Sequence, residues 1–173
     1  LHGPVGDERV VFQVRTTTVR HHKGEISLPG GRRDDTDASF LHTALRETHE
    51  EVGIPPDVIR ILGALDDVET FGSRNLIRPY VGLVAEGVEP SITARREVQQ
   101  LLHVPLAHLL SPEARVWKVA DRDGHLESTP AFDYEGHVIW GATARVVTQF
   151  LDLCAGGRVL DGRTESRANR TRA

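Results

Sequence analysis

Several features are scarce in this 173-residue chain, and each absence excludes some classes of protein. The single cysteine, Cys154, cannot form an internal disulfide, which favours a reducing compartment. Its apolar position in a helical pattern predicts a buried structural thiol. No apolar run approaches the roughly 18 residues of a membrane span. A net charge of −4 offers no basic footprint for nucleic acid. We therefore expect neither a membrane nor a nucleic acid as partner.

Methionine is absent and the chain opens at Leu1, so we expect that residue 1 is not the natural translation start. The beginning shows no signal-peptide pattern, and we expect a cytoplasmic location, with an organelle matrix as the alternative. Size and composition favour one globular domain over residues 1–156. Residues 157–173 follow as a polar, arginine-rich stretch, expected to be a flexible basic tail that is either solvated or phosphate-binding.

Hydrophobic periodicity predicts interspersed strands and helices without internal repeats. Strands are expected over residues 10–14, 59–65, 76–85, 115–120, 126–134 and 137–140. The sequence Asp-Arg-Asp-Gly at 121–124 predicts a hairpin turn. An amphipathic helix is expected over 142–154, and another ends at Gly53. This order favours an α/β fold with a mixed sheet between helices.

The most informative segment is 30–54, where a Gly-Gly turn leads into the helix that ends at Gly53. At about 3.6 residues per turn, Glu47, Glu50 and Glu51 fall on one side, roughly opposite a mostly apolar face. Three carboxylates on the same side of one helix turn repel one another, so a cation is expected beside them. Oxygen ligands suit Mg²⁺ or Mn²⁺, which also bind substrate phosphates. The alternative is a solvated acidic face on which Arg46 and Glu50 form an ordinary i,i+4 pair.

This segment resembles the Nudix box: a glycine, an acidic residue further on, then Arg-Glu-x-x-Glu-Glu-x-Gly and an aliphatic residue. The matching positions are Gly31, Asp37, Arg46, Glu47, Glu50, Glu51, Gly53 and Ile54. Asp37 stands where the family pattern has glutamate, and one extra residue precedes Arg46, which predicts a longer loop. The resemblance implies a Nudix-type α/β/α sandwich and a Mg²⁺ or Mn²⁺ ion held by Gly31, Glu47, Glu50 and Glu51. It also implies a strand upstream of residue 1, which the domain over residues 1–156 is expected to lack.

Residues outside the box resemble the coenzyme A diphosphatase branch of this family, over roughly 10–155. Gln13, Thr16 and Leu28 depart from the threonine, serine and phenylalanine of that branch. The resemblance implies metal-dependent cleavage of coenzyme A or its thioesters into 4′-phosphopantetheine and adenosine 3′,5′-bisphosphate. Another nucleoside diphosphate derivative (NADH, ADP-ribose or an oxidised nucleotide) is the alternative. A non-catalytic nucleotide sensor is a further alternative, against which the intact glutamates argue.

The candidate catalytic residues are Glu50, Glu51, Arg46 and Glu97. Arg46 is expected to orient the glutamates through bidentate hydrogen bonds. By resemblance, Glu97 occupies the place of a further ligand or base; the alternative is a plain surface glutamate. Substrate contacts are expected from the basic residues Arg15, Arg20, His22, Lys23 and Arg78, with Arg74 as a further candidate and solvated loops as the alternative. The expected partner is a small-molecule phosphate ester as substrate. A homodimer is left open as a further expectation.

Overall fold

The computed structural model describes residues 1–16, 24–70, 75–122 and 125–156. Its helices are α1 (Phe40–Val52), α2 (Leu106–Leu110) and α3 (Gly141–Cys154), with short 3-10 turns at Pro56–Val58 and Pro112–Ala114. The strands are β1 (Arg9–Arg15), β2 (Ile26–Ser27), β3 (Ile59–Ala64), β4 (Val68–Glu69), β5 (Leu76–Ile77), β6 (Tyr80–Val84), β7 (Val98–Pro105), β8 (Arg115–Arg122), β9 (His125–Tyr134) and β10 (His137–Ile139). The mixed α/β architecture predicted from the sequence is confirmed.

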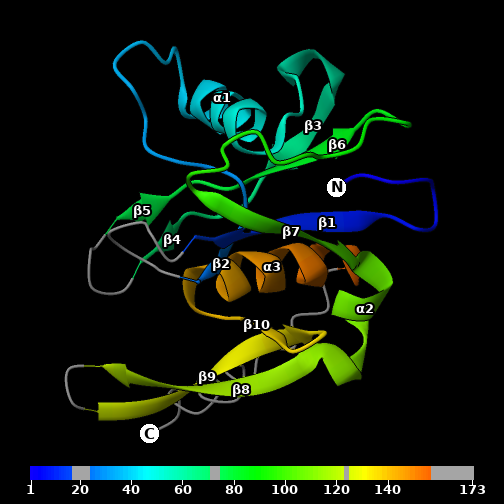
Figure 1. Ribbon diagram of the computed structural model, residues 1–173. Helices are drawn as coiled ribbons and strands as arrows, with labels where there is room; N and C mark the ends of the chain where they lie inside the picture. The colour runs from blue at the N-terminus through cyan, green and yellow to red at the C-terminus, as the bar shows by residue number, and fades with distance from the viewer. Residues whose placement is uncertain (17–23, 71–74, 123–124, 157–173) are drawn as a thin grey trace, which may run out of the picture.

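Strand β1 is the middle strand of a three-stranded sheet, between β2 and β7. The other groups of paired strands are β10-β9-β8, β3-β6 and β4-β5. All pairings between described residues are antiparallel, so the parallel pairs of the expected mixed sheet are not among them. Five consecutive residues of β1, Val10 to Val14, are buried. Since successive side chains of a strand point to opposite faces, β1 must be covered on both sides. Figure 1 shows α1 and α3 on opposite sides of the layer that β1 and β7 form.

Two hydrophobic clusters occupy these two sides. The larger cluster joins Phe12 of β1 and Leu102 of β7 to Val147 and Leu151 of α3. The smaller cluster contains Val52, Ile54 and Val84, with Leu101 packed against it. Leu101 and Leu102 are neighbours on β7, so the alternation of that strand divides the two clusters. The C-terminal end of α1 is therefore anchored to the sheet on the side away from α3.

Two expectations about single elements are wrong. The strand expected over 76–85 is divided into β5 and β6, and Pro79, between them, has no N–H to donate to a ladder. Cys154 is exposed rather than buried. It is the last residue of α3, one turn beyond the buried Leu151, so the helix ends before its apolar face can cover the thiol.

The hairpin expected around 121–124 is confirmed by the pairing of β8 with β9, which continues to Arg122 opposite His125. The tail expected at 157–173 lies outside the described residues. Within the part of the chain that is described, no helix combines the length and apolar character needed to cross a membrane.

Candidate active site on helix α1

Helix α1, which carries the glutamates, has a defined start and end. Ser39 is the N-cap, and its Oγ accepts a hydrogen bond from the backbone N–H of His42 at 3.1 Å. At the other end, Gly53 adopts the left-handed conformation with φ of 70°, and its N–H donates to the carbonyl of His49. A left-handed cap of this kind is why glycine stands at this position.

The segment after β6 closes the C-terminal end of α1. The N–H of Ser91 donates to the Val52 carbonyl at 2.9 Å. The Thr93 hydroxyl donates to the Glu50 carbonyl at 2.6 Å. These bonds satisfy carbonyls that a helix end would otherwise leave without partners. The same segment continues to Glu97, so the position of that residue is tied to the helix.

The Gly30-Gly31 turn lies directly over two of the glutamates. The N–H of Gly30 donates to Glu51 Oε2 at 2.9 Å. A Cβ on Gly31 would lie only 2.5 Å from the carboxyl carbon and one oxygen of Glu47. Only a residue without a side chain allows the backbone to approach the carboxylate this closely.

Glu51 is a buried carboxylate, with 4% of its surface exposed. Burial raises the pKa of Glu51, although the Gly30 N–H and the Gln13 side chain hydrogen-bond to it and oppose the shift. The neighbouring charge of Glu47 raises the pKa further. A cation placed here would remove this cost, since an opposite charge favours the ionised form.

Arg46 connects two of the glutamates to the loop before the helix. Its Nε and Nη2 each lie 3.0 Å from an oxygen of Asp37, which is a bidentate pair. Nη2 also lies 2.9 Å from Glu47 Oε1, and Nη1 lies 3.1 Å from Glu50 Oε2. The i,i+4 pair of Arg46 with Glu50, which belonged to the alternative of a solvated acidic face, is thus present as one part of a larger network. The bidentate contact goes to Asp37, whereas each glutamate receives a single contact.

Asp37 is the point at which the chain departs from the family pattern, and it is almost completely buried. Besides Arg46 it accepts hydrogen bonds from the Thr43 hydroxyl and from the Asp34 N–H, both at 2.9 Å. The Arg46 guanidinium, the largest influence, holds the pKa of Asp37 well below its usual range. The aspartate is therefore charged and fixed, and it holds Arg46 in place beside the glutamates.

Glu97 and Arg15 meet at an irregularity in the central sheet. The β1–β7 register shifts between Val14 and Arg15, which places Arg15 opposite Val98. Its Nη2 lies 3.7 Å from Glu97 Oε2. The buried Nε of Arg15 has no hydrogen-bond partner among the described residues, and its charge offsets part of the burial cost of Glu51. At this irregularity Arg15 thus lies within ion-pair distance of Glu97 and near enough to Glu51 to lower its pKa.

Of the remaining candidates for substrate contact, the structure describes only Arg78. Arg78 makes a bidentate pair with Asp67 at 3.0 and 2.8 Å, and its guanidinium lies 5.1 Å from the ring centre of Phe40 at the start of α1. The residues Arg20, His22, Lys23 and Arg74 lie outside the described part of the chain.

Three contributors were not predicted: Asp37 as the partner of Arg46, Gln13 as a neighbour of Glu51, and Thr93 at the helix end. Gln13 and Thr93 come from segments far from α1 in sequence, so no local pattern could reveal them. Asp37 offered a signal, because the family pattern places an acidic residue before the arginine, although one residue nearer to it than in this chain.

The NUDIX domain profile matches residues 5–118. The chain therefore belongs to the Nudix family, and it is a Nudix hydrolase of nucleoside diphosphate derivatives. Solved structures agree with the fold. A Nudix hydrolase from M. smegmatis, RenU, superposes with a TM-score of 0.56 at 18% identity, covering 92% of this chain and 84% of that one. An Ap4A hydrolase of C. elegans gives a TM-score of 0.51 at 14% identity, covering 61% and 75% of the two chains.

Curated relatives match at higher identity. The uncharacterized Nudix hydrolase NudL of Photorhabdus laumondii is 36% identical over 135 residues, which are 78% of this chain and 71% of the relative. The mitochondrial coenzyme A diphosphatase NUDT8 of Homo sapiens is 36% identical over 155 residues, 88% of this chain and 65% of the relative. Nudix hydrolase 22, chloroplastic, of Arabidopsis thaliana is 35% identical, and the match spans only half of its length.

Proposed function

We propose that this Nudix hydrolase cleaves the diphosphate of coenzyme A or its thioesters, giving 4′-phosphopantetheine and adenosine 3′,5′-bisphosphate. One observation carries the proposal. The human relative, named a coenzyme A diphosphatase, is 36% identical over a match that covers 88% of this chain. The similarity thus extends well beyond the Nudix box, into segments that diphosphate hydrolysis alone does not require.

The donor atoms around α1 fit a divalent ion of the Mg²⁺ or Mn²⁺ type. They are oxygens only, and burial raises the pKa of the Glu51 carboxyl, to which no basic side chain among the described residues donates a hydrogen bond. The side chains of Glu47, Glu50 and Glu51 would hold the ion together with the carbonyl of Gly31, whose backbone touches Glu47. When bound, the ion would neutralise phosphate oxygens and lower the pKa of a coordinated water.

The residues around these ligands would have separate roles in the reaction. Arg46, fixed by Asp37, orients Glu47 and Glu50 and leaves the substrate to other groups. The glycines of the turn let the backbone approach the diphosphate. Glu97, 55% exposed at its side chain, would accept the proton of the attacking water. The water oxygen forms the new bond to phosphorus while the bridging P–O bond breaks.

Substrate recognition would fall to the basic residues beside this site. Arg15 supports this role because its buried Nε has no hydrogen-bond partner among the described residues. Arg20, His22 and Lys23 belong to the same proposal on sequence grounds, and Arg78 lies near the start of α1. A homodimer and a cytoplasmic or matrix location stay predictions.

A substrate panel tests the proposal. Coenzyme A, dephospho-coenzyme A, NADH, ADP-ribose and an oxidised dGTP are each incubated with the chain, with and without Mg²⁺, and the products are identified. We expect the highest kcat/KM for coenzyme A, only with the ion present. Faster hydrolysis of NADH or ADP-ribose would reassign the substrate. Nucleotide binding without any turnover would favour the sensor alternative.

Two variants that each remove one arginine charge, one in the proposed site and one outside it, test the recognition residues. Arg20→Ala should raise the KM for coenzyme A and leave kcat near normal, since the contact is made equally in the ground and transition states. Dephospho-coenzyme A should be less affected if Arg20 contacts the 3′-phosphate. Arg60→Ala, an exposed arginine on β3, is the matched control and should change neither value. Equal effects of the two variants would remove Arg20 from the site.

A further inference from the structure

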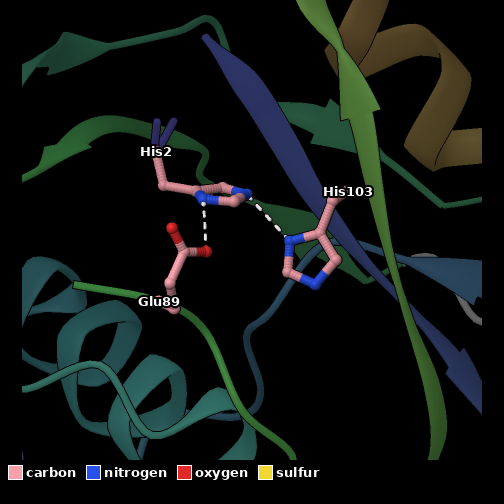
Figure 2. Close-up of side chains that lie close together, drawn as sticks. All are labelled: His2, Glu89 and His103. Carbon is pink, nitrogen blue, oxygen red and sulfur yellow. Dashed lines mark hydrogen bonds and ion pairs between the residues drawn. The ribbon is translucent and has the colours of Figure 1, made fainter. Parts of the chain in front are cut away.

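A second group of metal-binding side chains lies away from α1. Figure 2 shows His2, Glu89 and His103 pointing toward one another from three separate segments. His2 belongs to the N-terminal segment, which forms an isolated bridge to Arg9. Glu89 lies in the segment after β6, and His103 lies on β7 opposite Val11. None of these residues takes part in the proposed hydrolysis.

The three side chains are close enough to share an ion. His2 Nε2 and His103 Nδ1 lie 2.9 Å apart, and His2 Nδ1 lies 3.5 Å from Glu89 Oε2. One ligand atom from each residue can be chosen so that all lie within 4.8 Å of one another. At metal–ligand bonds of about 2.1 Å, two ligand atoms of a tetrahedral zinc site lie roughly 3.4 Å apart. His2 Nδ1 and Glu89 Oε2 already have this separation. His103 faces the other nitrogen of His2, so its ring must turn toward the ion to become the third ligand.

His2 is the buried member of the group, with 3% of its surface exposed, and its Nδ1 has no hydrogen-bond partner among the described residues. A neutral imidazole carries one donor and one acceptor nitrogen. If His2 donates to His103, its Nδ1 lone pair faces the Glu89 carboxylate, which is repulsive. If His103 donates instead, the N–H of His2 Nδ1 is left at 3.5 Å from the carboxylate, without a good hydrogen bond. Neither neutral arrangement satisfies the group. Both His2 nitrogens are matched only when the ring carries a second proton or when a metal cation takes the place of that proton.

We propose that His2, Glu89 and His103 bind a divalent transition-metal ion of the Zn²⁺ type. Two imidazoles and one carboxylate form a donor set that suits zinc, whereas Mg²⁺ prefers oxygen ligands alone. The Glu89 side chain is 72% exposed, so the ion can enter from solvent and a fourth position stays open to water. The bound ion joins the N-terminal segment to β7 and to the segment that closes α1.

Metal retention in excess Mg²⁺ tests this site separately from the glutamates, because Mg²⁺ occupies oxygen ligands and competes poorly for imidazole. The chain is prepared with Cys154→Ser to remove thiol binding and dialysed against Zn²⁺, and the metal content is measured. We expect one retained zinc per chain. At a free Zn²⁺ concentration of 100 times Kd, the Tm should rise by about 5–10 °C. Co²⁺ in place of Zn²⁺ should give the visible absorption of a four-coordinate site.

Two variants test the proposed ligands, and a third variant serves as the control. His103→Gln and Glu89→Gln should each weaken Zn²⁺ retention at least about tenfold and abolish the rise in Tm. His137→Gln, on β10, should leave both unchanged. Glu89 is exposed, so its replacement keeps the test valid even if His103→Gln destabilises the fold. Failure of the parent chain to retain zinc, or equal retention by Glu89→Gln, would overturn the proposal whatever the substrate panel shows.

Discussion

Replacing Gly31 with alanine adds one methyl group at the point where the turn touches the glutamates. The new Cβ would lie 2.5 Å from the Glu47 carboxyl carbon, whereas ordinary contact begins near 3.4 Å. The carboxylate must therefore retreat by about 0.9 Å. Gly31 does not have a positive φ, so alanine brings no backbone strain of its own.

A flexible side chain can make this retreat at little cost to folding, and we expect the Tm to stay within about 3 °C of the parent. The expected effect on catalysis is larger. Glu47 would lose both its contact with Arg46, 2.9 Å in the parent, and its proposed place beside the ion. A displacement near 1 Å in an active site costs about 100-fold in rate. We expect kcat to fall by about this factor at saturating Mg²⁺, and the Mg²⁺ concentration for half-maximal activity to rise.

Gly63→Ala in β3 is the matched control, because nothing lies within 4 Å of the Cβ that it would add. The assay is a Mg²⁺ titration of steady-state turnover, with Tm measured on the same preparations. Near-parental kcat and Mg²⁺ dependence in Gly31→Ala would refute the placement of Glu47 as a ligand under the turn. A collapse of Tm would instead show that the carboxylate cannot move and that the loss of activity follows from unfolding.

Three further predictions concern the same network. Glu51→Gln keeps the size but removes the charge, so turnover should fall about a thousandfold with Mg²⁺ present, as judged by initial rates, while the fold persists by circular dichroism. Arg46→Lys cannot reproduce the bidentate contact with Asp37, and we expect kcat to fall about tenfold or more with little change in KM. Asp37→Asn should lower the Tm at pH 7. Because the Arg46 guanidinium lowers the pKa of Asp37, the stabilisation is complete above the unfolded value of about 4 and is lost as pH falls below it. The Tm difference between Asp37→Asn and the parent should therefore shrink below pH 4, and a constant difference would argue against this charge effect.

Features set by local pattern could be predicted from the sequence. The helix that ends at Gly53 follows from apolar spacing and from a glycine able to adopt the left-handed cap. The β8–β9 hairpin follows from two runs of strand residues around a turn sequence. The family resemblance predicted the fold class because the Nudix box implies how the surrounding strands and helices are arranged.

Features that depend on contacts between distant segments could not be predicted. The register shift beside Arg15 arises from the pairing of β1 with β7, about eighty residues further along the chain. The exposure of Cys154 depends on where α3 ends relative to the sheet, although the periodicity alone assigns it to the apolar face. His2 and His103 meet only because the N-terminal segment and β7 lie side by side.

The segment from Glu89 to Glu97 links three of these features within nine positions of the chain. Glu89 faces the two histidines, Thr93 closes the end of α1, and Glu97 meets Arg15 beside the glutamates. Hydrogen bonds at Thr93 hold the middle of the segment to the helix, so its two ends cannot move independently of α1. A metal ion bound at Glu89 would therefore restrict the segment that positions Glu97. If so, Zn²⁺ should change the Mg²⁺-dependent turnover of the parent chain but not that of Glu89→Gln, and an equal response of both chains would show that the two sites are uncoupled.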